Sequence, residues 1–284
     1  MKNTLFFKIA ALSAVLSVIV CSSIMAQLAP STGSGVSVSP SHLHFSVGPG
    51  GSKTYKIKIN NDTDRPNKFA VKMNDFNMNG RGKSSFIPPG EGKYSLSKYL
   101  TVSPTFIDLA PGEVKEVAVT LSLSGKEQAA FKAAWSVLMI EQVEERKALD
   151  PGRGDGKTIA MGVIPTFAFG VFMYQNPPNV EINKVEIIGF KYLEEEAKRS
   201  VKIGVKNIGD GVSYCTSYVE LTNLNNGEQH KLHVKNFTIV PELIRDFDFD
   251  LPEDLSAGKY SAAAVLDFGS DEEIEVAELE FQIE

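Results

Sequence analysis

Serine, histidine and cysteine are the residues most able to carry chemistry in this sequence of 284 residues, and they are few and scattered. There are four histidines and two cysteines, and no Gly-x-Ser-x-Gly motif that would place a nucleophilic serine on a sharp turn. Acidic side chains are so frequent toward the C-terminus that pairs of them specify no general acid or base. We therefore expect a protein that is not an enzyme.

Two groups of residues resemble metal ligands. His42 and His44 lie two residues apart, so they share one face of a strand, but a third ligand is not evident. Asp246, Asp248 and Asp250 alternate with phenylalanine, which indicates an amphipathic strand with its acids in water, and Leu251 follows where a calcium loop needs glycine. Residues 267–273 are a weaker calcium candidate. We expect no metal and no cofactor.

The segment Asp150–Thr158, DPGRGDGKT, superficially resembles a phosphate-binding loop. The required spacing fails, because Pro151 occupies the position of the first glycine and no helical pattern follows. The tripeptide Arg153-Gly154-Asp155 matches an integrin-binding motif, but glycine and aspartate are common in hairpin loops. We interpret the segment as a loop.

The N-terminal 26 residues predict a signal peptide. Lys2 and Lys8 precede a 12-residue apolar stretch, Ile9–Val20, and small residues lead to Ala26. That stretch is shorter than the ~20 residues of a membrane-spanning helix. We expect an exported protein that begins near Gln27, with no transmembrane span in the mature chain, in the periplasm or at the cell surface.

The remaining 258 residues are enough for two domains. Residues 27–178 hold 17 basic and 13 acidic side chains, net +4, whereas residues 179–284 hold 10 and 22, net −12. This difference supports a boundary near Pro177-Pro178 and argues against a nucleic-acid partner. Cys215 is the one cysteine left after cleavage, so the mature chain has no internal disulfide, and we expect a buried, inert thiol.

Alternating apolar and polar residues predict strands throughout both domains. In the second, seven strand candidates and frequent turn signals are typical of a β-sandwich. The candidates are Val180–Ile188, Val201–Val205, Tyr214–Leu221, Leu232–Ile239, Ile244–Leu251, Tyr260–Phe268 and Ile274–Ile283. The charged segment Lys191–Arg199 is interpreted as a hairpin loop. The predicted fold class is all-β, with two immunoglobulin-like β-sandwiches in tandem: 1–26 signal peptide, 27–35 flexible leader, 36–178 first sandwich and 179–284 second sandwich.

The most informative segment is Ile159–Tyr174, IAMGVIPTFAFGVFMY. Two interpretations stay open: a strand buried on both faces at a corner between domains, or an edge strand that a partner extends by strand addition, which Pro165 favours. In the second case one face of the strand would contact the partner, through Met161, Val163, Phe167, Phe169, Val171 and Met173.

The first domain resembles the PapD-like fold of periplasmic pilus chaperones. The matching elements are SPSHLHF, GPGGSKTYKIKINNDTDRP, FIDLAPGEVKEVAV, AAWSVLMIEQVEE and AMGVIPTFAFGVFMYQNPP. It is equally similar to the peptidoglycan-associated domain of WxL-interacting surface proteins, in which a turn corresponds to Phe76–Gly80. The resemblance covers residues 35–178 and implies a scaffold that binds an extended polypeptide or a cell-wall surface.

The chain departs from the usher-pathway chaperones at one important site. Those chaperones hold a subunit's terminal carboxylate with an arginine and a lysine, whereas Ser41, His42 and the run Gly170–Phe172 occupy these regions here. We expect a non-catalytic envelope protein that assembles or tethers another exported or cell-surface protein. The alternative is a module that binds peptidoglycan or carbohydrate near Asn77–Gly80 and Trp135.

Overall fold

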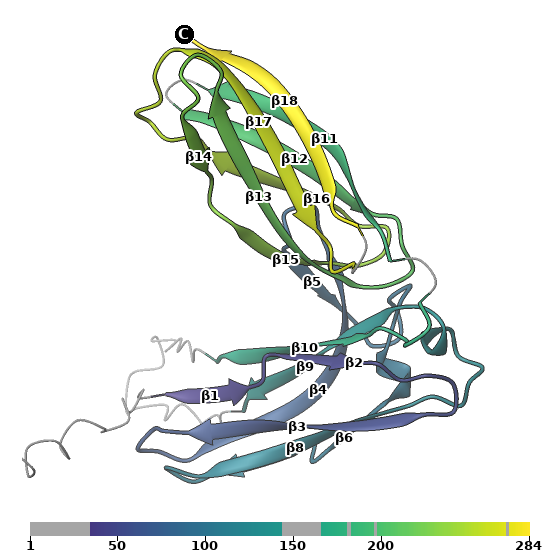
Figure 1. The fold of residues 1–284 in the computed structure, drawn as a ribbon. Helices are drawn as coiled ribbons and strands as arrows, with labels where there is room; N and C mark the ends of the chain where they lie inside the picture. The colour runs from purple at the N-terminus through teal and green to yellow at the C-terminus, as the bar shows by residue number, and fades with distance from the viewer. Residues whose placement is uncertain (1–34, 144–165, 181–182, 196–197, 271–272) are drawn as a thin grey trace, which may run out of the picture.

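The computed structural model describes residues 35–143, 166–180, 183–195, 198–270 and 273–284, which form two immunoglobulin-like β-sandwiches in series (Figure 1). The predicted signal peptide, most of the leader, the loop 150–158, and Met161 and Val163 lie outside the described residues. No helix among the described residues is long and apolar enough to cross a membrane.

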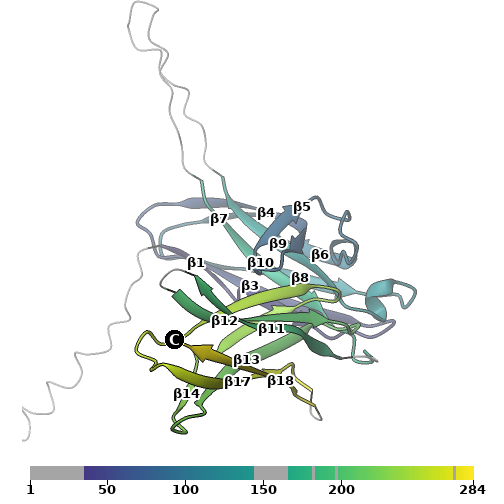
Figure 2. The same ribbon diagram turned by 90° about the horizontal axis from the view of Figure 1, so that it is seen from above.

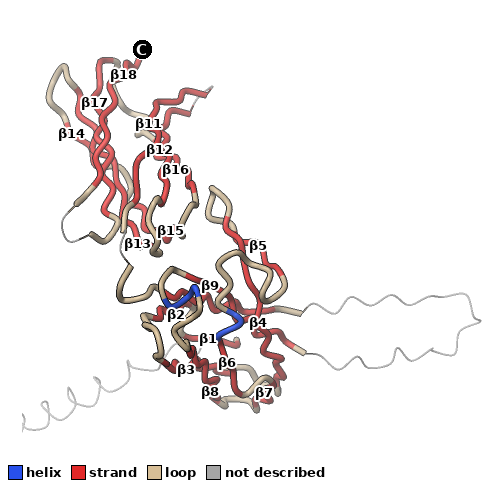
Figure 3. Tube along the Cα trace, turned by 90° about the vertical axis from the view of Figure 1, so that its right-hand side faces the viewer, coloured by secondary structure: helices blue, strands red, loops and turns tan. Residues whose placement is uncertain are grey.

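The first sandwich contains β1–β10 in two sheets, with two short 3₁₀ turns, η1 (Ser97–Tyr99) and η2 (Gln128–Ala130) (Figure 3). One sheet has the order β1 (Val36–Ser39), β3 (Ser52–Asn61), β8 (Val114–Ser122), β6 (Leu100–Ser103). The other has the order β2 (His42–Phe45), β10 (Ala168–Gln175), β9 (Ala134–Gln142), β4 (Asn67–Met78), β5 (Ser84–Ile87), and β7 (Phe106–Leu109) also pairs with β4.

The second sandwich contains β11–β18, which Figure 2 shows as two layers. One sheet has the order β11 (Val185–Glu195), β12 (Lys198–Asn207), β16 (Ile244–Asp250). The other has the order β14 (Gln229–Lys231), β13 (Ser213–Asn223), β17 (Gly258–Asp267), β18 (Glu275–Ile283), and β15 (Lys235–Ile239) also pairs with β13.

The strands form because their side chains alternate between a core face and a solvent face. In β3, Ile57 is fully buried and pairs with Val117 of β8, while the neighbouring Lys56 forms an ion pair with Glu116 on the outer face. Each sandwich has its own apolar cluster between its two sheets. The prediction of an all-β fold with two sandwiches is confirmed.

The segment Lys191–Arg199 is not the loop that its charge predicted. Strand β11 continues to Glu195 and β12 begins at Lys198, and these two residues are paired with each other. The charges are compatible with strands because alternate side chains point to solvent, whereas Tyr192 packs against the core and stacks on Phe281, with 4.4 Å between ring centroids. The loop was predicted because the segment is highly charged, but the inward-facing Tyr192 is enough to hold it in the strand.

A buried asparagine ends one strand in each domain. The side-chain amide of Asn61 donates to the carbonyls of Arg65, Leu109 and Ala110. Asn207 does the same in the second domain, with donation to the carbonyls of Gly211 and Ile239. Both side chains are fully buried. Each buried amide thereby has its own hydrogen bonds satisfied and ties nearby backbone carbonyls to the end of a strand.

Candidate functional site

Strand β10 has one open side. It pairs with β9 over its whole length, Ala168–Gln175, but on its other side it pairs with β2 only from Phe172 to Gln175. In the part of the chain that the structure describes, no strand pairs with residues 168–171 on that side. We call this stretch the free edge of β10.

The hydrogen bonds around β10 show which backbone groups point to the free edge. The amide of Phe172 donates to the carbonyl of Ser41, on the β2 side, and the carbonyl of Phe167 accepts from the amide of Gln142, on the β9 side. Backbone groups of successive residues in a strand point to opposite neighbours. The N–H and C=O groups of Ala168 and Gly170 therefore point away from β9, into the free edge.

The free edge exists because the N-terminal strand changes sheets. Residues 36–39 form β1, which pairs with β3 in the opposite sheet, and residues 42–45 form β2 beside β10. The two strands are joined through Pro40, which follows a cis peptide bond. The N-terminal chain thus pairs with only half of β10. Strand β1 instead forms an edge of the other sheet, with its half-buried Val36 and Val38 packed against the core.

The predicted contact residues divide into an accessible and a buried group. Phe167 is 41% exposed and directly precedes β10, with its ring centroid 5.4 Å from that of Phe169, which is half-buried. Val171 and Met173 are fully buried in the core of the first sandwich. The placement of these two in a partner contact was wrong, because their face of β10 is the core face of the sheet.

The opposite face of β10 is covered by the second domain at its C-terminal end. Tyr174 is 2% exposed and belongs to an apolar cluster with Phe76, Val212 and Val240, the last two from the second domain. The ring centroid of Phe172 is 5.0 Å from that of Phe76. This half of the strand is buried on both faces at a corner between domains, while residues 168–171 keep an open edge. The interpretation as a strand buried on both faces therefore holds for residues 172–175, whereas partner binding at the open edge stays a prediction.

Histidines and tyrosines form the rim of the domain junction. The Nδ1 atom of His44 is 2.6 Å from the hydroxyl of Tyr214, which belongs to the second domain. His42 lies on the same face of β2, as predicted, with its ring parallel to that of His44. Burial, followed by the charge of His42, lowers the pKa of His44, and burial raises the pKa of Tyr174 to about 12. The described residues contain no cluster of three or more metal-ligating side chains, and the two histidines pack within this rim.

Three ion pairs join basic residues of the first domain to acidic residues of the second. They are Arg81 with Asp248, Lys93 with Glu242 at 2.7 Å, and Lys132 with Asp210 at 3.1 Å. All six side chains are substantially exposed, so solvent screens these pairs and they contribute little to stability. In all three pairs the basic residue belongs to the first domain and the acidic residue to the second, in agreement with the unequal charges of the two halves of the sequence.

The β4–β5 hairpin extends from the first domain toward the second (Figure 1; Figure 3). At its tip, the carbonyl of Gly80 accepts a hydrogen bond from the amide of Asp246 at 2.9 Å. The turn Asn77–Gly80, one of the predicted carbohydrate contacts, therefore lies at the domain junction.

Trp135, the other predicted carbohydrate contact, is buried. It is 8% exposed, its Nε1 donates to the carbonyl of Phe76 at 3.0 Å, and Tyr94 stacks on its ring with 4.7 Å between centroids. A sugar platform requires an open aromatic face, so the prediction of a carbohydrate contact at Trp135 was wrong. The residue is covered because both faces of β9 are buried.

The remaining candidates for chemistry have structural roles. Asp246, Asp248 and Asp250 form ion pairs with Lys202, Arg81 and Lys198 in turn, and they point along the outer face of β16 as the alternation predicted. Cys215 is a buried free thiol, and burial raises its pKa to about 12. The prediction of a buried cysteine is confirmed.

Comparisons with known proteins identify similar solved structures only. No protein-family model matches the chain, and no curated protein matches it. The structure "Class 5 Fimbriae Chaperone CfaA" is similar over 87% of this chain and 98% of that chain, with 14% sequence identity and a TM-score of 0.44. The YadV chaperone covers 87% of this chain and 99% of its own, with 12% identity and a TM-score of 0.42. A chain of a CFA/I chaperone–tip adhesin complex is similar over 87% of this chain and 98% of its own, with 13% sequence identity and a TM-score of 0.43.

Proposed function

We propose that this protein is a non-catalytic component of the cell envelope that binds an extended segment of another exported protein along the free edge of β10. The observation that carries the proposal is the pair of residues Ala168 and Gly170, whose backbone groups point away from β9 with no strand beside them in the described part of the chain. An added strand would satisfy these groups by strand addition. The predicted signal peptide supports an envelope location.

The side chains at the free edge favour this use. Ala168 and Gly170 are small, so they leave the outer side of the edge open to another backbone. Phe167, directly before the first residue of β10, adds an exposed aromatic ring beside the free edge. Unpaired strand edges attract other chains, and in the proposed role this property serves the binding of a specific partner in an assembly, chaperone-like or tethering function.

Ser41 and His42 are a serine and a histidine whose side chains contact each other. Ser41 Oγ lies 3.0 Å from Nδ1 of His42, a distance suited to a nucleophile and its base. Among the described residues, however, no carboxylate is hydrogen-bonded to the His42 ring to orient it, and such a third group is part of the catalytic arrangement. The two side chains are exposed neighbours in sequence, which accounts for their hydrogen bond.

Replacement of Gly170 by proline tests the backbone contact. The Gly170 amide points away from β9, so proline removes one donor from the free edge and leaves the β9 ladder intact. Gly170→Ala is the matched control: its Cβ would meet Val137 Cγ2 at 3.4 Å, an ordinary contact, and the amide is kept. Envelope proteins that co-purify with the tagged chain should be lost with G170P and retained with G170A.

Photo-crosslinking at Phe167 gives an independent test. We expect p-benzoylphenylalanine at position 167 to crosslink to the same protein that G170P loses. The same group at Phe131, which is 55% exposed near the opposite end of β9, should not. Equal retention of the partner by G170P and G170A, with both variants folded by circular dichroism, would refute binding at this edge.

A further inference from the structure

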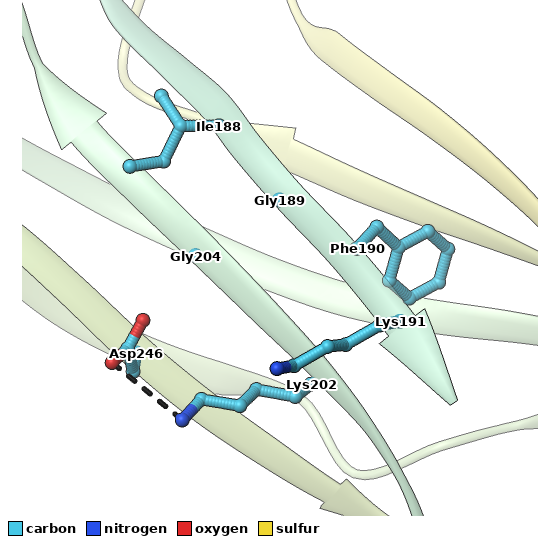
Figure 4. A pocket seen from close by; sticks show the side chains of 7 residues that line it. All are labelled: Ile188, Gly189, Phe190, Lys191, Lys202, Gly204 and Asp246. Atoms are coloured by element: carbon cyan, nitrogen blue, oxygen red, sulfur yellow. Dashed lines mark ion pairs between the residues drawn. The ribbon is translucent and has the colours of Figure 1, made fainter. Parts of the chain in front are cut away.

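The outer face of the β11–β12–β16 sheet contains a groove that the proposed function does not use. Its volume is about 420 Å³, and it is lined by backbone and side chains of all three strands (Figure 4). Gly189 and Gly204 form its floor, Ile188 its apolar wall, and Lys191, Lys202 and Asp246 its polar rim. A volume of this size is in the range of small-ligand sites.

The two glycines of the floor are not required by backbone conformation or by close packing. They are paired directly across β11 and β12, where the register shifts between Ile187 and Gly189, and neither has a positive φ. A Cβ on Gly189 would meet nothing within 4 Å, and a Cβ on Gly204 would meet Asp246 Oδ1 at 3.4 Å and Ile188 Cγ1 at 3.6 Å, both ordinary contacts. Glycine within a strand weakens the strand and is often found where a ligand approaches the backbone. The pair leaves a flat surface of exposed peptide groups.

The charges at the rim are also unfavourable for the sheet by itself. Lys191 and Lys202 are directly opposite each other, and like charges in this position destabilise a sheet. Lys202 Nζ lies 3.6 Å from Asp246 Oδ2, whereas Lys191 forms no ion pair with any described residue. Figure 4 shows both lysine side chains extended toward the Asp246 side of the groove. A ligand anion between the two ammonium groups would offset their repulsion.

We propose that this groove binds a small organic anion in which a single carboxylate is attached to a six-membered ring. The ring would lie on the Gly189–Gly204 floor beside Ile188, and the carboxylate would lie between Lys191 and Lys202. Asp246 limits the net positive charge of the rim to one, which favours a monoanion over a polyanion such as phosphate. Its free oxygen would accept a hydrogen bond from a ring hydroxyl.

Two sources share this chemistry, an aromatic acid and a sugar acid, and a titration separates them. The probes are sodium benzoate and sodium glucuronate, added to the ¹⁵N-labelled mature chain and followed by the amide signals of Gly189 and Gly204. We expect saturable shifts with at least one of the two, and benzamide, the neutral analogue of benzoate, should bind at least tenfold more weakly. Absence of saturable shifts with both acids, or equal binding of benzamide and benzoate, would overturn the proposal.

Two variants locate the binding. Lys191→Gln should weaken it severalfold, whereas Lys198→Gln, which removes another lysine of the same sheet outside the groove, should not. Gly189→Val should fill the floor and abolish binding while the melting temperature stays equal or rises, because a β-branched residue suits a strand. If G189V proves unstable, Gly204→Ala provides the same test with one methyl group. Retention of binding in the folded floor variant, or equal affinity of K191Q and K198Q, would refute the site.

Discussion

Asp75 is a buried carboxylate whose loss should loosen a loop at the domain junction. It is 1% exposed; its Oδ2 accepts from the amides of Gly90 and Gly92 at 2.7 and 3.1 Å, and its Oδ1 accepts from the hydroxyl of Ser136 at 2.7 Å. The loop held in this way continues to Lys93, which forms the ion pair with Glu242 of the second domain.

Replacement of Asp75 by alanine and by asparagine should have unequal effects. Alanine leaves the amides of Gly90 and Gly92 without their acceptor, which at about 1–3 kcal/mol for each fully buried group would cost about 2–6 kcal/mol. Because both amides are only partly buried, we expect a loss in the lower part of this range, about 2–4 kcal/mol. Asparagine can keep its oxygen toward these amides and donate from its nitrogen to Ser136 Oγ, whose own hydroxyl can still donate to the Trp135 carbonyl, a contact of 2.8 Å. Its cost should be about 1 kcal/mol, mainly for the lost charge.

Urea unfolding followed by tryptophan fluorescence measures both losses. Trp135 is the single tryptophan of the sequence, and its stacking partner Tyr94 lies in the same loop, so its emission reports on the affected region. Ser85→Ala, on the exposed face of β5, is a suitable control. Equal destabilisation by D75A and D75N, or a loss below about 1 kcal/mol for D75A, would refute the assignment of the carboxylate as the acceptor that holds this loop.

Two further predictions concern groups whose pKa the fold changes. Because burial lowers the pKa of His44 below its usual 6.5, the unfolded chain binds a proton there at a higher pH than the folded chain; stability should be unaffected by this group above pH 6.5 and should fall as the pH drops below it. Urea midpoints measured across this range should show a weaker decline for His44→Gln, and an identical decline would contradict the prediction. Burial raises the pKa of the Cys215 thiol to about 12, so iodoacetamide should label the folded mature chain far more slowly than the chain in urea; comparable rates would show that the thiol is accessible.

The sequence predicted the strands better than it predicted their surroundings. The candidates Tyr214–Leu221, Ile244–Leu251 and Tyr260–Phe268 all correspond to strands, because alternation records which side chains face the core. The candidate Leu232–Ile239 begins too early, because only its second part, Lys235–Ile239, forms a strand (β15), and residues 232–234 separate that strand from β14, which ends at Lys231. The short strand β5 was missed because SSFI carries no alternation.

Trp135 shows why the candidate site was only partly predictable. Alternation along β9 identifies two faces, but it does not reveal that the second domain covers the outer one. Trp135 lies on that outer face, in the cluster with Val212 and Val240, so a residue expected at an exposed site is buried. The burial of Val171 and Met173 could not be predicted from the sequence for a related reason. An apolar strand face suits a protein core and a protein partner equally well, and only the positions of the neighbouring strands distinguish these two cases.

The open and closed halves of β10 have a common cause in the path of the N-terminal strand. If β2 began four residues earlier and paired with β10 from Ala168 onward, the edge of β10 would be fully paired and the strand would be a purely structural element. The change of sheets at Pro40 instead leaves Ala168 and Gly170 open, while Tyr174, further along the same strand, is fixed between the two domains. A partner bound at the open half would therefore attach to a strand whose other half is anchored in the domain junction. Such an arrangement would couple the binding edge to the orientation of the second domain, and mutations at Tyr174 or Val240 should affect partner binding without contacting the partner.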